Sequence, residues 1–168
     1  MATTDPSRVV LRQLAATLAY RAAKVLRDVP EGFAERSFGD STRQPVQIVA
    51  HMADLMAWGV SMAGGGEEWK AGGGTDWATE VERFFAGLAA VDAALAADGP
   101  FAGSIDKMIQ GPLADALTHV GQLSMLRGMA GSPVRPESYA RATIVAGRVG
   151  LDQAPPGYEF DGDASQRK

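Results

Sequence analysis

Four stretches of the sequence carry apolar residues at steps of three and four positions, and glycine and proline gather between them. That spacing places apolar side chains on one face of an α-helix. The stretches run from about residue 7 to 28, from 45 to about 63, from 77 to the DGP sequence at 98–100, and from 111–112 to 131. Because such helices bury their apolar faces against one another, we predict an all-α protein built as a four-helix bundle.

The expected packing faces of the first three helices follow from the same spacing. They are Val10, Leu14, Leu18, Ala22 and Val25; then Val46, Val49, Met52, Met56 and Val60; then Trp77, Val81, Phe84, Phe85, Leu88, Val91 and Leu95. Pro45 suits the first turn of the second helix. Thr75 or Asp76 can cap the third helix. These signals place the starts of two helices.

The remainder of the chain is expected to complete a single domain spanning residues 1–168. A chain of 168 residues can bury one sizeable core, and no internal linker is long enough to separate two domains. The segment RPESYARAT at 135–143 predicts a short extra helix. The following residues predict an extended tail packed on the bundle, with about 160–168 disordered.

Composition and charge exclude several classes of function. The formal net charge of −4 argues against a nucleic-acid partner, which usually meets a basic face. The absence of cysteine excludes disulfides and thiolate ligands or nucleophiles from the chain itself. No signal-peptide pattern and no apolar run of about 18 residues is present. We therefore expect a cytoplasmic protein with no membrane partner.

An unusual polar stripe lies in the fourth predicted helix, in the sequence LADALTHVGQL at 113–123. Asp115, His119 and Gln122 recur at four- and three-residue steps, which places them on one helix face. Apolar residues flank this stripe on both sides, so we expect it to face the interior. The other histidine of the chain, His51, lies between Ile48 and Leu55 on or beside the packing face of the second helix.

Two interpretations of these residues remain open. Side chains from facing helices of a bundle can hold a metal ion, and two imidazoles with one carboxylate suit zinc, iron(II), nickel or manganese. His51, Asp115 and His119 are the candidate ligands, and Gln122 is a candidate partner of His119 or of a substrate. Alternatively, Asp115 and His119 form a structural pair four residues apart on one helix. Spacing alone does not separate the two.

Trp69 is the one aromatic residue between the glycine triplets at 64–66 and 72–74. A tryptophan on such a loop can act as a lid over a pocket, or it can anchor the loop. We favour the anchor.

Two segments resemble the DinB-like, or YfiT-like, family of metal-dependent enzymes. QPVQIVAHMADLMAW at 44–58 is similar to the family's second helix, with its metal-binding histidine in an I-x-x-H-x-x-D-x-x-x-W pattern. LADALTHVGQLSMLRGMAGSPV at 113–134 is similar to its fourth helix, where H-x-x-H-H-R-G-Q is usual. Aligning Gly121-Gln122 on that G-Q makes His51 and His119 histidine ligands and puts Asp115 where the family has a third histidine. Thr118 and Val120 also depart from the pattern.

The resemblance implies a four-helix bundle and a homodimer. It also implies a metal-dependent enzyme acting on a small molecule, because characterised relatives use low-molecular-weight thiols as S-transferases or as a maleylpyruvate isomerase. We therefore expect a divalent-metal-dependent S-transferase, isomerase or hydrolase, with no catalytic residue assigned beyond the metal ligands. The alternative is a metal-free small-ligand-binding or dimerisation module containing the Asp115–His119 pair.

Overall fold

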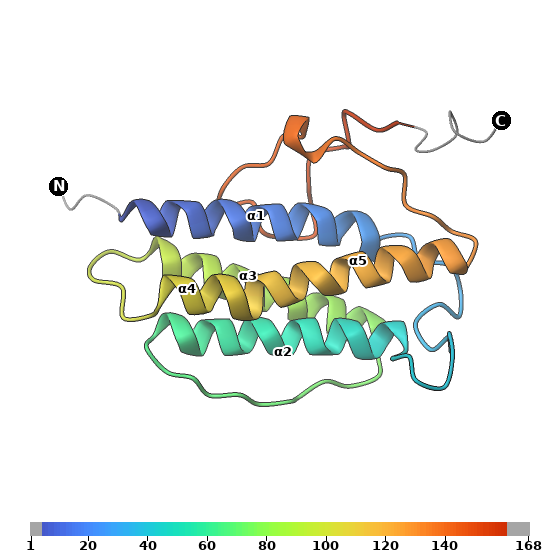
Figure 1. Ribbon diagram of the computed structural model, residues 1–168, viewed down its shortest axis with the longest axis horizontal. Helices are drawn as coiled ribbons and strands as arrows, with labels where there is room; N and C mark the ends of the chain where they lie inside the picture. Colours follow the sequence, from blue (N-terminus) through green and yellow to red (C-terminus); the bar gives the residue numbers. More distant parts are fainter. Residues whose placement is uncertain (1–4, 161–168) are drawn as a thin grey trace.

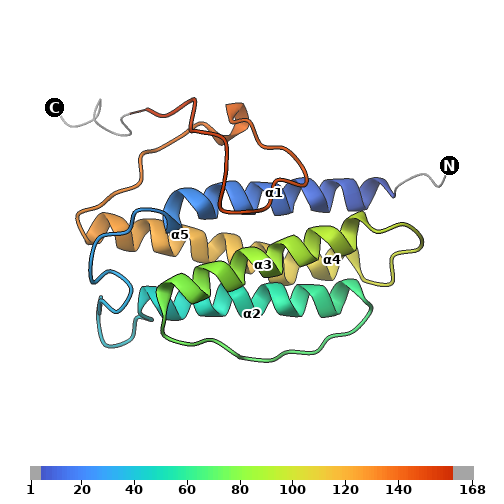
Figure 2. The same cartoon turned by 180° about the vertical axis from the view of Figure 1, so that it is seen from behind.

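The computed structural model describes residues 5–160, and four helical rods dominate it (Figures 1 and 2). The first three rods are α1 (Pro6–Leu26), α2 (Pro45–Ala63) and α3 (Trp77–Ala96). The fourth consists of α4 (Ile105–Met108), the π-helical η1 (Ile109–Leu113) and α5 (Ala114–Met129). A 3₁₀ turn, η2 (Tyr139–Arg141), follows. The all-α prediction is confirmed, since residues 5–160 contain no strand and a single isolated antiparallel bridge.

The rods do not simply alternate in direction. The long loop after α2 runs back along the whole bundle, so α3 begins at the same end as α2 (Figures 1 and 2). α1 and the fourth rod point the opposite way. One long crossover of this kind is a known variation of four-helix bundles. It carries the glycine-rich loop past the middle of α2.

The fourth rod starts earlier than the sequence predicted. Ser104 caps α4 by accepting a hydrogen bond from the Lys107 backbone N–H, so the rod begins at Ile105. Gly111 has non-helical torsions, with φ −92° and ψ −107°, and Pro112 lies inside the rod. Gly111-Pro112 therefore marks a kink and not the start of a helix, because proline removes a backbone donor and clashes with the preceding turn.

The end of the fourth rod matches its sequence signal. Gly131 has a φ of 80°, the left-handed conformation that glycine adopts without steric cost. The Gly131 N–H donates to the Gly128 carbonyl and the Ser132 N–H donates to the Arg127 carbonyl. This pair of bonds is a Schellman motif, which satisfies the last carbonyls of the helix.

The core lies between all four rods, and one predicted position in α1 is wrong. Leu18, Met52, Leu88 and Leu123, one from each rod, are fully buried. Val10 was expected on the packing face, yet it is 62% exposed. The buried stripe of α1 consists of Leu11, Ala15, Leu18, Ala22 and Val25. The predicted positions from Leu18 onward were correct, but the first two, Val10 and Leu14, lie at the edge of the buried stripe.

Two buried arginines close the ends of other helices. Arg8 at the start of α1 donates to the carbonyls of Leu95, Ala97 and Gly99 at the end of α3. Arg127 near the end of α5 donates to the carbonyls of Val25, Arg27 and Asp28 at the end of α1. The last carbonyls of a helix lack partners within the helix and carry its negative dipole end, so a guanidinium satisfies both needs.

The segment after α5 crosses over α1, in agreement with the predicted extended tail (Figure 1). Tyr20 donates a 2.7 Å hydrogen bond to Glu137, and Lys24 pairs with Glu137 at 2.8 Å and with Glu159 at 2.7 Å. Val149 is buried against the bundle. The predicted disorder falls mainly on 161–168, which lie outside the described residues. No helix in the described part of the chain has both the length and the apolarity that crossing a bilayer requires.

Candidate metal centre

His51, Asp115 and His119 meet where the middle of α2 faces the start of α5. Asp115 lies between the two imidazoles, with one oxygen 3.5 Å from Nε2 of His51 and the other 3.4 Å from Nε2 of His119. The imidazole centroids are 4.9 Å apart and nearly perpendicular. One ligand atom from each residue lies within 4.8 Å of the other two. The fold thus brings together the three residues selected from the sequence.

The spacing of these atoms fits a metal ion better than it fits direct hydrogen bonds. Both Asp115–histidine separations exceed the usual N–H···O range of about 2.7–3.2 Å. Two ligands, each about 2.0–2.1 Å from a tetrahedral zinc ion, lie roughly 3.4 Å from each other. The Asp115–His51 and Asp115–His119 distances are each close to that separation, and each involves a different oxygen of the Asp115 carboxylate.

The expectation that the whole polar stripe faces the interior is wrong for two of its members. The His119 side chain is buried, but the Asp115 side chain is 45% exposed and Gln122 is exposed. The stripe runs along the edge of the α2–α5 interface, because the apolar residues Ala116, Val120 and Leu123 occupy the centre of that face. The three candidate ligands consequently lie at the edge of the α2–α5 interface, with one side open to solvent.

Gln122 fixes the orientation of His119. Its Oε1 lies 2.7 Å from Nδ1 of His119. When Nδ1–H donates to this oxygen, Nε2 of the neutral ring has a lone pair that points toward the Asp115 carboxylate. Two lone pairs that face each other require a proton or a cation between them. The Gln122 contact therefore prepares Nε2 as a ligand atom, as partners of metal-bound histidines commonly do.

His51 is tuned toward the neutral form that binds metals. Burial is the largest effect that lowers the pKa of His51 below its usual value of 6.5. The neighbouring His119 and Arg43 lower this pKa further, while Asp115 opposes them. Burial and nearby positive charge both penalise the imidazolium. His51 therefore keeps its lone pair to lower pH than a free histidine would.

Trp69 packs beside His51. Its ring centroid is 5.6 Å from that of His51 and 5.8 Å from that of Trp58, with edge-to-face geometry in both pairs. The side chain remains 45% exposed. Trp69 both holds the loop against α2, as an anchor would, and shields one face of a candidate ligand.

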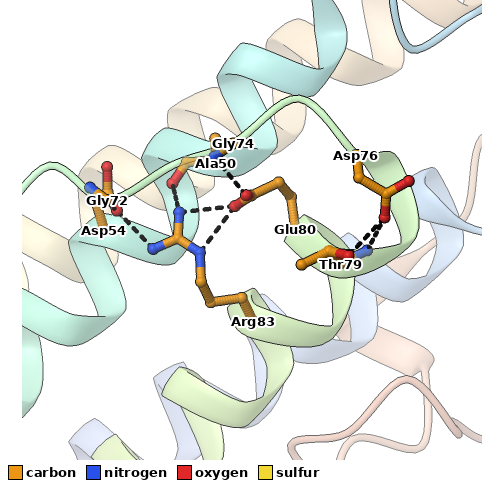
Figure 3. Close-up of polar contacts among 8 residues, drawn as sticks. All are labelled: Ala50, Asp54, Gly72, Gly74, Asp76, Thr79, Glu80 and Arg83. Atoms are coloured by element: carbon orange, nitrogen blue, oxygen red, sulfur yellow. Dashed lines mark hydrogen bonds and ion pairs between the residues drawn. The ribbon is translucent and has the colours of Figure 1, made fainter.

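A polar network fixes the loop beyond Trp69 (Figure 3). The carboxylates of Asp54 and Glu80 accept hydrogen bonds from the backbone N–H groups of Gly72 and Gly74, at 3.1 and 2.6 Å. Arg83 bridges both carboxylates, at 2.6 Å to Asp54 and 2.8 Å to Glu80. The same figure shows Asp76 capping α3 through Thr79, as predicted. This network ties the glycine-rich loop to α2 and α3.

A pocket of about 370 Å³ opens beside His119, between the loop before α2 and the exposed side of α5. It is lined by Ser41, Thr42, Arg43, Ile48, His119, Gln122, Met125 and Leu126. Arg43 was not among the site residues predicted from the sequence. Its only local signal was a basic residue two positions before the Pro45 helix start, and nothing in the irregular 27–44 connection revealed which way it turns.

Comparison of the chain with protein-family models, with curated proteins and with solved structures finds no match in any of the three.

Proposed function

We propose that this protein is a divalent-metal-dependent enzyme of the DinB-like, or YfiT-like, kind, with His51, Asp115 and His119 as the metal ligands. The supporting observation is the convergence of two imidazoles and one carboxylate, with ligand atoms within 4.8 Å of one another. The motif resemblance in α2 and α5 supports the same proposal. Its substrate is a small molecule, and a homodimer is the assembly that the resemblance implies.

Each residue has a distinct role in this proposal. His51 and His119 contribute neutral nitrogen ligands, and Asp115 contributes one negative charge that offsets half of the charge of a divalent ion. Gln122 keeps Nε2 of His119 directed at the centre. A divalent ion held here supplies Lewis acidity, which lowers the pKa of a water or a thiol that reaches it. Three protein ligands leave room for such a group, as S-transferase, isomerase or hydrolase chemistry requires.

Metal analysis tests the proposal directly. Protein purified without a nickel column, exposed to zinc and then desalted is expected to retain about one ion per chain. The variants Asp115→Ala and His119→Ala should retain much less. Thr118→Ala is the matched control, because Thr118 lies between them on α5 with its side chain exposed. Metal-free wild type, or equal metal in all four proteins, would contradict the proposal.

A metal-free binding or dimerisation module is the second candidate. Asp115 lies within 3.5 Å of both imidazoles, so a protonated histidine could pair with it without any ion. Thermal denaturation separates the two candidates. A metal ion whose free concentration is 100 times its dissociation constant stabilises the fold by about 2.7 kcal/mol, and EDTA should remove that stabilisation. A melting temperature that EDTA leaves unchanged would favour the metal-free module.

A further inference from the structure

The pocket beside His119 contains one formally charged side chain that the metal centre does not use. Of its lining residues, only Arg43 carries a permanent charge. The hydroxyls of Ser41 and Thr42 lie next to it in the chain, and Ile48, Met125 and Leu126 form an apolar side. The volume of about 370 Å³ lies at the small end of ligand pockets, which typically enclose about 300–1,000 Å³. The lining therefore suits a small ligand with one polar and one apolar end.

Arg43 differs from the other arginines in the described part of the chain. Those others contact a carboxylate, a backbone carbonyl or an aromatic ring. They are Arg8, Arg12, Arg21, Arg27, Arg36, Arg83, Arg127, Arg135, Arg141 and Arg148. Within residues 5–160, no hydrogen bond or ion pair engages Arg43, and its side chain is exposed at the pocket. Its five N–H donors are thus available to a ligand.

A guanidinium selects planar anions. Its forked donors match the two oxygens of a carboxylate, and such charge-assisted pairs are stronger and more directional than neutral ones. A ligand whose carboxylate meets Arg43 can lay its apolar part on Met125 and Leu126. That position brings the ligand next to His119, which lines the same pocket.

We propose that this pocket binds a small carboxylate, with its charge paired to Arg43 and its apolar part against Met125 and Leu126 of α5, in the pocket that His119 also lines. Because it assigns a charge to the substrate, this proposal rests on the proposed function. The pairing with Arg43 itself requires no metal. Arg43 is a specificity-determining residue in this arrangement and takes no part in bond making.

Two matched pairs of probes test the proposal, namely benzoate with benzamide and hexanoate with hexanamide. Within each pair the size is conserved and the charge differs. Backbone amide NMR shifts give the affinity of each probe and the residues affected, in metal-free and in zinc-loaded protein. The wild type is expected to bind at least one carboxylate about fivefold more tightly than its amide, with shifts at residues 41–48 and 119–126.

Arg43→Gln should remove this preference while leaving the amide affinity unchanged. Arg141→Gln is the matched control, because it removes the same charge from an exposed arginine whose guanidinium lies over Tyr158 and outside the pocket. Since no hydrogen bond or ion pair within residues 5–160 engages Arg43, the variant should retain the wild-type melting temperature.

Three results would overturn the inference: no binding of either carboxylate, equal affinity for acid and amide, or a preference that survives in Arg43→Gln. Failure of the proposed function gives a different result. In that case the chain retains no zinc, yet the carboxylate preference and its dependence on Arg43 persist in the metal-free protein. A chain that retains zinc but shows no preference would leave the metal proposal standing and reject this inference.

Discussion

Gln122 illustrates how much one exposed side chain can contribute to a site through a buried one. Among the described residues its side chain hydrogen-bonds to neither Asp115 nor His51, and it acts through the 2.7 Å contact with Nδ1 of His119. That contact selects which ring nitrogen faces the other ligands. Residues that orient a metal-bound histidine in this way commonly account for a 10- to 100-fold effect on affinity, by rough comparison with other sites.

We expect Gln122→Met to weaken zinc binding about 10- to 100-fold, because methionine has similar length but its thioether is only a weak acceptor for the Nδ1–H hydrogen bond. Gln122→Glu retains an acceptor and should keep most of the affinity. Competition with a chromophoric chelator measures both. Gln13→Met on α1 is the control for the same substitution away from the site. Equal affinities in the methionine variant and the wild type would exclude the orienting role.

The lowered pKa of His51 has a defined consequence for stability in the absence of metal. Above about pH 6.5, His51 is neutral in the folded and the unfolded chain, so it makes no pH-dependent contribution. Below pH 6.5 the unfolded chain binds the proton first. The free energy of unfolding should then fall with pH until the folded-state pKa is passed.

Urea denaturation in EDTA at a series of pH values tests this consequence. The wild type should lose stability relative to His51→Gln as the pH falls below 6.5, and the difference between them should be constant above it. A wild type that gains stability over the variant in acid would show that the Asp115 pairing outweighs burial and would reverse the sign of the shift.

Among the contacts between elements, α2 and α3 pack tightly at a glycine. A Cβ atom added to Gly87 of α3 would lie 2.7 Å from Cβ of the fully buried Met56 of α2. Neither helix backbone can yield at this point without moving the surrounding core. A single methyl group should therefore separate the two helices, even though alanine favours the helix more than glycine does.

Gly87→Ala is expected to lower the free energy of unfolding by about 1–3 kcal/mol, because overpacking outweighs helix propensity. Gly121→Ala in α5 is the matched comparison, since a Cβ there has no neighbour within 4 Å. That variant should gain about 0.5–1 kcal/mol. Urea denaturation of both gives the answer, and effects of the same sign would contradict this account of the α2–α3 contact.

The loop network depends on one arginine that two carboxylates share. The side chains of Asp54 and Glu80 are almost completely buried, and Arg83 forms an ion pair with each of them. Removing one partner of a buried ion pair costs about 3–5 kcal/mol. Since the Arg83 side chain is 31% exposed, water can partly replace it. We therefore expect Arg83→Met to cost about 3 kcal/mol, at the lower end of that range.

Arg36→Met controls for the loss of one positive charge, because Arg36 is exposed and lies over the ring of Phe38. Its effect should stay within about 0.5 kcal/mol. Chemical denaturation compares the two variants. If Arg83→Met also stayed within that limit, the network would not be what holds the glycine-rich loop.

At the scale of the whole molecule, local signals explain which parts of the fold the sequence predicted. Pro45 and Asp76 act within one turn, so the starts of α2 and α3 were correct. Gly111-Pro112 carries the same local signal, but the packing of both flanking segments on one bundle overrides it and produces a kink. A dipeptide cannot reveal whether the residues before it will find tertiary partners.

The candidate site divides in the same way. The Asp115–His119 spacing follows from helix geometry alone, whereas the approach of His51 depends on how α2 lies against α5. The pocket could not be predicted from local sequence patterns, because contacts with distant residues determine the path of the 27–44 connection. Phe33 is buried against Trp77 in an edge-to-face pair, and the Ala34 carbonyl accepts from the Val46 N–H. Those contacts determine where Arg43 lies.

The two buried arginines also determine when the fold can be completed. The carbonyls at the end of α1 receive their donors from Arg127, about 100 residues later in the chain. During synthesis, α1 leaves the ribosome before α5, so these carbonyls lack the Arg127 donors until α5 has emerged. Arg8 likewise gains its carbonyl partner only after the end of α3 has been synthesised. A chain interrupted before residue 127 therefore lacks the side chain that donates to the carbonyls of Val25, Arg27 and Asp28.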